Sequence, residues 1–360
     1  MTARPLVKPR TLVWLGLATA FVLWATALGL GSQAFAAALF ASVLPLPIYI
    51  AAALWIDRFE PEPRGMLAMA FLWGASVAIL AAGVVNVSVG SSFGERAASI
   101  FSAPVAEESL KALILFRFYR RKRSEFDGVV DGVIYAAMVG LGFAFMENID
   151  YYGRALNKDG PSGLAVTFTL RGVMGPFAHP LFTSATGIGL GLARQTHRRW
   201  LRVLAPPAGL LTAMTLHAAW NTGASLGCGF FVVYFVVMVP SMAGLLAIAA
   251  FSLKAEGRTI HVYLAADRER GALAPVEYDV LCSVRGRLHA SVTALTHHGW
   301  RAWRRRQAFH RAASEIAFYR HRVADGDEPA DPARESDWDA RLLDVQGQPS
   351  PAVTPGQAAS

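Results

Sequence analysis

Long apolar runs alternate with short charged loops over residues 1–253, whereas charged positions recur every few residues from 254 to 360. About 20 apolar residues are needed for an α-helix to cross the ~30 Å hydrocarbon layer of a membrane. The apolar runs predict transmembrane helices at about residues 11–31, 35–56, 65–88, 98–116, 128–149, 164–193, 203–222 and 229–252. Gly175, Pro176 and Pro180 interrupt the sixth run, which predicts a kink there. The pattern indicates an all-α fold, a polytopic membrane bundle of about eight transmembrane helices.

Positive charge is distributed unequally between the loops on the two sides of this bundle. The amino-terminal segment and the alternate loops that would share its side carry 14 Lys and Arg residues, and the opposite loops carry three. Lys and Arg near the ends of spans favour the cytoplasmic side. We therefore expect a multi-pass protein of the plasma membrane with both termini in the cytoplasm.

The composition supports a membrane protein and gives little support to nucleic-acid binding. Hydrophobic residues make up 54% of the chain and charged residues 17%, below the quarter that is usual in soluble domains. The net charge is +8, and residues 1–253 hold 19 Lys and Arg against 12 Asp and Glu. Because the excess lies mainly in loops beside the spans, we expect no nucleic-acid partner. The two cysteines, Cys228 and Cys282, form no metal or redox motif.

The residues after the membrane-embedded region (1–253) divide into two predicted segments. Residues 254–323 are basic, and apolar positions between 276 and 321 recur at helical spacing. A basic amphipathic cytoplasmic helix that bears Trp300 and Trp303 fits either a membrane surface or the loops of its own protein. Residues 324–360 are acidic and then rich in Pro, Gly, Ala and Ser, which predicts disorder. The apolar positions at helical spacing between residues 276 and 321 are Val280, Val284, Leu288, Val292 and Leu295.

Charged side chains are costly at membrane depth, and the fourth predicted span contains three of them. Glu107 and Lys111 are four residues apart and share a helix face, so a buried ion pair is one interpretation. The adjacent Glu108 points about 100° away and is not explained by that pair. Two neighbouring carboxyl groups in a medium of low dielectric constant favour acid–base chemistry, in which one of them is the general base.

Three more spans carry polar side chains at membrane depth. The fifth ends in Glu147-Asn148, the sixth contains His179, and the seventh ends in His217 and Asn221. His217 and Asn221 share a helix face, so the amide is expected to orient the imidazole or to donate to a substrate oxygen. A lone histidine in a span usually packs helices together. Here, however, two histidines, a glutamate pair and a third glutamate come from four different spans. We therefore expect them to meet in one cavity in the outer half of the bilayer.

Imidazole and carboxylate groups are the ligands of a catalytic zinc, which keeps one position open for water. His179, His217 and Glu107 are the candidate metal ligands in this sequence. The same groups can also act without a metal, with a glutamate as the base and a histidine that polarises the water. In that case His217 and Asn221 would stabilise the oxyanion. Both alternatives stay open at this point.

Four short motifs follow one another in four of the predicted spans and are together more specific than any one of them. They are Glu107-Glu108-x-x-Lys111, Gly142-Phe143 with Glu147-Asn148, His179 with Thr183 and Gly187, and His217-x-x-Trp220-Asn221, preceded by Asp57-Arg58-Phe59-Glu60-Pro61-Glu62-Pro63. In these motifs the chain resembles the PrsW family of intramembrane proteases. That family is related to the CAAX prenyl protease and to bacteriocin-processing membrane enzymes. The resemblance covers about residues 45–225.

The resemblance implies roles for the residues that match the motifs. Glu107 and Glu108 would be the catalytic glutamates, and His179 and His217 would bind water or a metal. Glu147 stands where the prenyl-protease relatives have a histidine in Phe-x-x-x-His, so a carboxylate replaces an imidazole there. The resemblance also implies cleavage of membrane-anchored proteins, including anti-sigma factors, on or near the outer face.

We therefore expect an intramembrane endopeptidase, a hydrolase that uses a glutamate-activated water, with zinc as its candidate cofactor. Its expected partners are a membrane-anchored protein substrate and the lipid bilayer. Two other classes are alternatives: a proton-coupled transporter that uses the glutamates as a relay, and a non-catalytic membrane scaffold. The inverted repeats common in transporters are not visible here. The candidate catalytic residues are Glu107, Glu108, Glu147, Lys111, Asn148 and Asn221.

Overall fold

The computed structural model describes residues 6–123, 125–326 and 328–346, and every regular element in these ranges is a helix. This confirms the predicted all-α class. The chain forms two compact units, one from Met1–Asp57 and Glu62–Ala249 and the other from Arg58–Pro61 and Ala250–Ser360. The long helix α12 (Val239–Tyr263) begins in the first unit and continues into the second.

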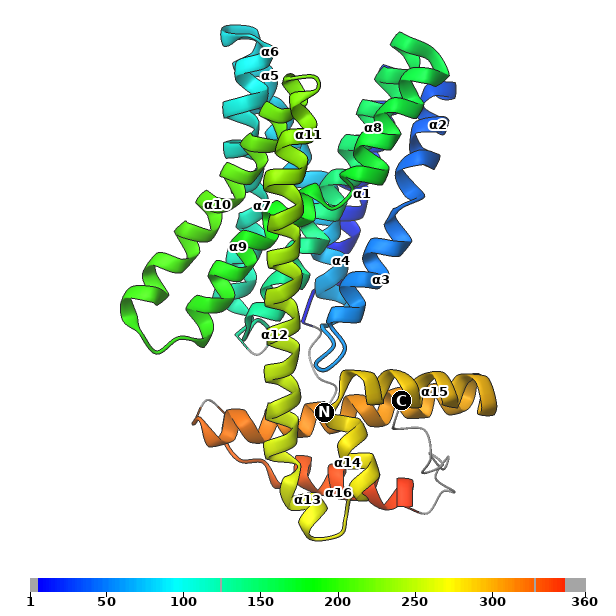
Figure 1. Ribbon diagram of the computed structural model, residues 1–360, viewed down its shortest axis with the longest axis vertical. Coiled ribbons are helices and arrows are strands. Elements are labelled where there is room, and N and C mark those ends of the chain that lie inside the picture. Colours follow the sequence, from blue (N-terminus) through cyan, green and yellow to red (C-terminus); the bar gives the residue numbers. More distant parts are fainter. Residues whose placement is uncertain (1–5, 124, 327, 347–360) are drawn as a thin grey trace. The chain divides into compact units, whose positions relative to one another are not determined.

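The first unit is a bundle of helices that run past one another in Figure 1. Several of them contain a short π-helical segment, in which the backbone hydrogen bonds span five residues. The helices are α1 (Pro9–Leu30), α2 (Ser32–Val43), α3 (Leu46–Ile56), α4 (Arg64–Trp73), α5 (Ile79–Phe93), α6 (Glu95–Ala97), α7 (Ala103–Arg121), α8 (Val129–Phe168), α9 (Ala178–Gln195), α10 (Arg199–Ser225) and α11 (Gly229–Val233). The π-helical segments are Gly74–Ala78, Ala98–Ser102, Thr169–Met174 and Tyr234–Met238.

Five helical stretches within the described residues are long and apolar enough to cross a membrane. They coincide with six of the eight predicted spans, because the longest stretch contains the fifth and the sixth. The two other predicted spans are helical as α7 and α10 but are less apolar, and α7 carries three buried charges. The five stretches are Pro9–Leu30, Ser32–Ile56, Arg64–Phe93, Val129–Gln195 and Gly229–Tyr263.

The predicted break near Gly175 and Pro176 is confirmed, and it sets the start of α9. The π-helical segment Thr169–Met174 ends there, and residues 175–177 form a turn before α9 begins at Ala178. Pro180 does not kink the helix as expected, because it lies in the first turn of α9, where backbone N–H groups need no helical partner. The break places His179 at the start of a helix and in the interior of the bundle.

Close backbone contacts hold α9 against α8 on one side, and α10 packs on its other side. A Cβ atom on Gly132 of α8 would lie 2.2 Å from the carbonyl oxygen of Gly187 in α9. A Cβ on Gly140 would lie 2.7 Å from the carbonyl oxygen of His179. Only glycine permits this approach, which brings the His179 backbone directly against α8. Figure 1 shows α9 and α10 side by side, joined by a short loop.

The second unit is helical and has its own apolar core. Its helices after α12 are α13 (Ala265–Glu269), α14 (Pro275–Cys282), α15 (Val284–Ala324) and α16 (Pro332–Gln346). The predicted continuous helix across residues 276–321 is wrong, since the chain breaks at Ser283 and turns again at Gly299, where φ is 77°. The core includes Phe59, Ile260, Tyr278, Ala313 and Trp338.

The expected disorder of residues 324–360 is wrong for Pro332–Gln346, which form α16. Trp338 and Leu342 of α16 are 2% and 3% exposed in the core of the second unit, and their burial stabilises the helix despite its acidic composition. The Trp338 indole also donates to Asp267 at 3.1 Å. Residues 347–360 lie outside the described residues.

Asp267 is the buried acid of the second unit. Burial alone would raise the pKa of Asp267, but hydrogen bonds from Arg320, Arg270 and Trp338 outweigh it and hold the pKa below its usual value. The carboxylate thus joins α13 to α15 and α16, and the contact depends on its negative charge.

Candidate active site

Helix α7 positions three ionisable side chains in the interior of the first unit. Glu107 is 4% exposed, and Glu108 and Lys111 are each 0% exposed. Because the three lie within five residues of one helix, neighbouring helices must supply the partners of the side chains that point away from each other. They do so differently for the two glutamates.

Glu108 receives three hydrogen-bond donors. Lys111 Nζ lies 2.8 Å and His217 Nδ1 lies 3.1 Å from Glu108 Oε1, and Thr183 Oγ1 donates to Oε2 at 3.0 Å. The donors come from α7, α10 and α9, so this carboxylate ties three helices together. The hydrogen-bonding needs of this buried carboxylate are therefore met by protein groups.

Glu107 is far less well paired than its neighbour. Its Oε1 accepts from the Asn86 amide of α5 at 3.2 Å, but its buried Oε2 has no hydrogen-bond partner. The nearest cationic or imidazole nitrogens to Oε2 are Lys111 Nζ at 3.7 Å and His217 Nε2 at 3.8 Å. The expected ion pair of Glu107 with Lys111 is therefore present, but Lys111 lies closer to Glu108, at 2.8 Å. His217 and Thr183 also contact Glu108, so Glu107 is the less well paired of the two glutamates.

Both ring nitrogens of His179 are occupied. Lys111 Nζ lies 2.9 Å from Nδ1, and Glu147 Oε2 lies 2.8 Å from Nε2. An ammonium group can only donate, so Nδ1 accepts and Nε2 carries the proton that is donated to Glu147. Lys111 also lies 3.8 Å above the ring of Phe143, which adds a cation–π contact.

Arg171 is a member of the cluster that the sequence did not single out as a site residue. It lies in the π-helical segment before α9 and forms an ion pair with Glu147. Its Nε donates to Asn148 Oδ1 at 2.7 Å. The pair holds Glu147, and through it the His179 ring, inside the bundle. An arginine within a predicted span was the signal that could have marked this position.

His217 is oriented by Glu108 and not, as expected, by Asn221. The Asn221 amide donates instead to the carbonyl oxygen of Ser99 at 2.8 Å. Because the His217 Nδ1–H donates to Glu108, its Nε2 keeps a lone pair that faces Glu107. The His217 ring stacks on Phe182, with centroids 5.0 Å apart, which fixes the ring plane.

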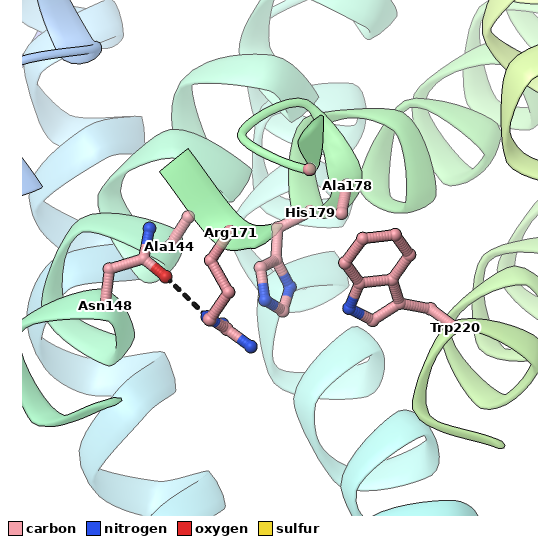
Figure 2. Close-up of a pocket in the computed structure, with 7 residues that line it drawn as sticks. Ala144, Asn148, Arg171, Ala178, His179 and Trp220 are labelled. Atoms are coloured by element: carbon pink, nitrogen blue, oxygen red, sulfur yellow. Dashed lines mark hydrogen bonds between the residues drawn. The ribbon is translucent and has the colours of Figure 1, made fainter. Parts of the chain in front are cut away.

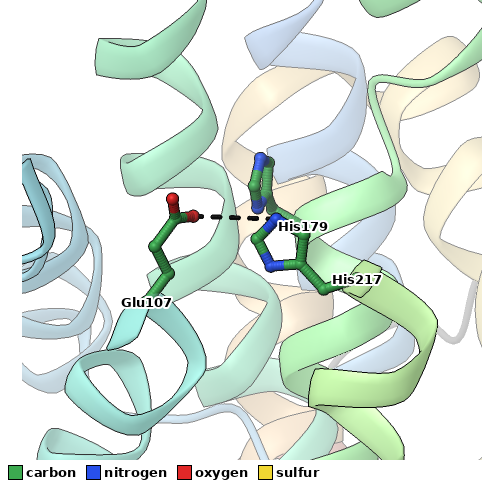
Figure 3. A group of neighbouring side chains, drawn as sticks. All are labelled: Glu107, His179 and His217. Carbon is green, nitrogen blue, oxygen red and sulfur yellow. Dashed lines mark ion pairs between the residues drawn. The ribbon is translucent and has the colours of Figure 1, made fainter. Parts of the chain in front are cut away.

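Glu107, His179 and His217 form a group that can hold a metal ion (Figure 3). One ligand atom from each lies within 4.8 Å of the other two. The donor set fits a metal: Glu107 Oε2 has no hydrogen bond, and His217 offers Nε2 while Glu108 holds its Nδ1–H, the usual second contact of a metal-bound histidine. His179 can bind a metal ion only when one of its ring nitrogens gives up its contact with Lys111 or Glu147.

A small cavity is lined by His179 of this group, and Figure 2 shows side chains that line it. The polar part of its wall is made by Arg171, Asn148 and His179, and the apolar part includes Trp220. The remaining lining residues, Ala144, Gly175 and Ala178, are small. The cavity gives the imidazole of His179 a neighbouring empty space bordered by hydrogen-bond donors.

These features define a helical membrane protein with a buried carboxylate–histidine centre. The family model for PrsW family intramembrane metalloproteases matches residues 62–245. Protease PrsW of Oceanobacillus iheyensis is 30% identical over 196 residues, which cover 54% of this chain and 84% of that protein. Protease PrsW of Geobacillus kaustophilus is 31% identical over 140 residues, which cover 38% of this chain and 58% of that protein. No solved structure matches the chain.

The chain belongs to the PrsW family of intramembrane metalloproteases. This confirms the family that the motifs indicated. The matched region contains every residue of the buried centre, from Asn86 in α5 to His217 in α10. The catalytic and metal-binding roles of the individual side chains stay predictions, which the geometry now makes specific.

Proposed function

We propose that this protein is an intramembrane endopeptidase that hydrolyses peptide bonds of membrane-anchored proteins, with Glu107 as the base that activates water. The observation that supports this most directly is the buried Oε2 of Glu107, which has no hydrogen-bond partner while Glu108 and Glu147 are both paired. A carboxylate oxygen held in this way is available to accept a proton from a water molecule. The anti-sigma factors implied by the family resemblance are candidate substrates.

The proposed reaction begins when Glu107 Oε2 takes a proton from water as the water oxygen attacks the scissile carbonyl carbon. Glu107 then passes this proton to the leaving amine nitrogen, and the C–N bond breaks. Arg171 and Asn148 border the cavity and provide N–H donors for the carbonyl oxygen of the substrate. A substrate helix must unwind locally, because its carbonyl groups are otherwise already hydrogen-bonded.

In the metal-dependent alternative, Glu107 would be a ligand rather than the base. It would hold the metal ion together with His179 and His217, and zinc is the candidate. Such an ion would act as a Lewis acid at this position. Glu108 would keep His217 in the tautomer that presents Nε2. Lys111 would remain paired with Glu108 when His179 turns away from it.

Comparison of membrane-fragment proteomes tests the proteolytic activity. Cells that produce the wild-type protein are compared with cells that produce Glu107→Gln, which keeps the shape of the side chain and an acceptor for Asn86 but removes the base. Glu95→Gln, a change of the same kind in the exposed helix α6, is the matched control. We expect new peptide termini with the wild type and the control, and their loss with Glu107→Gln.

A chelator arm and a metal measurement separate the two mechanisms. Purified wild-type protein should contain about one zinc ion per chain, and His217→Ala should lose it, as measured by mass spectrometry of the metal. Cleavage that survives both chelation and His217→Ala would contradict the metal role but not the role of Glu107. Cleavage that is unchanged in Glu107→Gln would contradict the proposed base itself.

We also propose eight transmembrane helices with both termini in the cytoplasm, on the basis of the charge distribution of the loops. The two native cysteines test this orientation. Cys228 is exposed in the turn before α11 and should react with an impermeant thiol reagent in intact cells. Cys282 in the second unit should react only after permeabilisation. Labelling of Cys282 in intact cells would contradict the orientation.

A further inference from the structure

Helix α15 of the second unit is an antiparallel helical hairpin rather than a straight rod. The chain reverses at Gly299, and Arg287 on the first arm donates to Ser314 on the second at 2.9 Å. Closer to the turn, the Gln307 amide donates to Ser291 Oγ at 2.9 Å. The arms lie side by side in Figure 1. The turn therefore forms a tip that projects from the paired arms.

The first arm carries an apolar stripe that the core of the second unit does not cover. Leu288, Val292 and Leu295 are spaced four and three residues apart, so they lie on one face of the helix. Their exposures are 46%, 50% and 43%. The opposite face of the same arm is buried through Ala290 and Ala294. This stripe leads directly to the hairpin tip.

The tip combines aromatic and basic side chains. Trp300 is 60% exposed, and its ring stacks on that of Trp303 with centroids 4.5 Å apart. Arg301, Arg304 and Arg305 surround the pair and are exposed. The whole of α15 contains nine arginines and one acidic residue. Indole rings favour the interface between water and lipid, and arginines bind phosphate groups.

We propose that the tip of the α15 hairpin docks on an anionic phospholipid surface. The apolar stripe and the Trp300–Trp303 pair would enter the interfacial layer, and Arg301, Arg304 and Arg305 would bind lipid phosphates. Charge complementarity selects this occupant over a neutral one, because the tip has three arginines and no acidic side chain. The chain is anchored in a bilayer, so such a surface is always at high local concentration. This inference does not depend on proteolytic activity.

Spin-label accessibility in the full-length protein tests the docking. A Thr296→Cys variant, in which Cys228 and Cys282 are changed to Ser, is labelled next to the tip and reconstituted in vesicles. The vesicles consist of phosphatidylcholine alone or of phosphatidylcholine with phosphatidylglycerol. With the anionic lipid we expect accessibility to oxygen to rise, and accessibility to a water-soluble nickel complex to fall by at least about threefold.

Two sets of variants test which side chains are responsible. Arg301→Gln, Arg304→Gln and Arg305→Gln together should abolish the difference between the two lipids, since each arginine near an anionic surface changes the bound-to-free ratio about fivefold. Trp300→Ser with Trp303→Ser should restore access of the nickel complex on the anionic vesicles.

Arg341→Gln is the matched control, since Arg341 is an exposed arginine of α16 whose partner is Asp337. It should leave both accessibilities unchanged. Equal accessibility in the two kinds of vesicle would overturn the proposal. Shielding that is the same in both lipids and in detergent micelles would show a protein contact instead, and it would overturn the proposal as well.

Discussion

Removing one partner of the Arg171–Glu147 ion pair should strongly destabilise the first unit, and Arg171→Met tests this. Methionine fills most of the arginine's volume but leaves the Glu147 carboxylate with His179 as its remaining partner. Removing one partner of a buried pair costs about 3–5 kcal/mol. Both side chains keep 17% exposure, so we expect a value near the lower end, about 3 kcal/mol. This corresponds to roughly a 150-fold change in the unfolding equilibrium.

A double-mutant cycle with Glu147→Gln isolates the pair, with reversible unfolding in mixed micelles followed by circular dichroism. We expect the double variant to be more stable than the sum of the single effects predicts, by about 1.5 kcal/mol or more. Arg171→Lys is the control, since it keeps the charge but lacks the planar fork that reaches both Glu147 and Asn148. Its loss should be smaller than that of Arg171→Met. Additive single effects would refute the reasoning.

Three further perturbations follow from the described contacts. Gly132→Ala would place a Cβ atom 2.2 Å from the Gly187 carbonyl oxygen and should destabilise the bundle by about 1–3 kcal/mol, measured by thermal unfolding, whereas Gly16→Ala, with nothing within 4 Å, should be silent. Trp338→Ala should cost about 3–5 kcal/mol and expose α16 to limited proteolysis. Because the pKa of Asp267 is depressed in the folded protein, its contribution to the free energy of unfolding is present above its pKa in the unfolded chain. This contribution is lost as pH falls below about 4. Asp267→Asn should remove this acid sensitivity of unfolding.

The sequence was sufficient for the helical class and for most of the apolar spans, because both depend on local composition and length. The motif residues were also visible, since charged groups are rare at membrane depth. What local spacing could not give was the pairing of these groups. Glu107 and Glu108 are adjacent in the chain, and their different environments come from α5, α9 and α10. Only the packing of these helices distinguishes the two carboxylates.

In the second unit, too, contacts between distant residues decide structure that local composition does not predict. Its carboxy-terminal segment has the composition of a disordered chain, yet Trp338 and Leu342 fold it into α16 by entering a core built mainly from distant residues. Helical spacing across residues 276–321 likewise suggested one rod. The backbone reverses at Gly299, where φ is positive, so residues 284–324 form a helical hairpin. A single glycine in the sequence is not enough to predict such a turn.

The three carboxylates of the buried centre differ in how well they are paired. Glu108 is satisfied by Lys111, His217 and Thr183, and Glu147 is satisfied by Arg171 and His179. The three buried carboxylates face only two permanent cations, so with neutral histidines one negative charge is in excess. That excess falls on Glu107, whose Oε2 is buried without a hydrogen-bond partner. A proton taken from water or a bound cation would balance it, and this is the physical reason for proposing Glu107, rather than its neighbour, as the base.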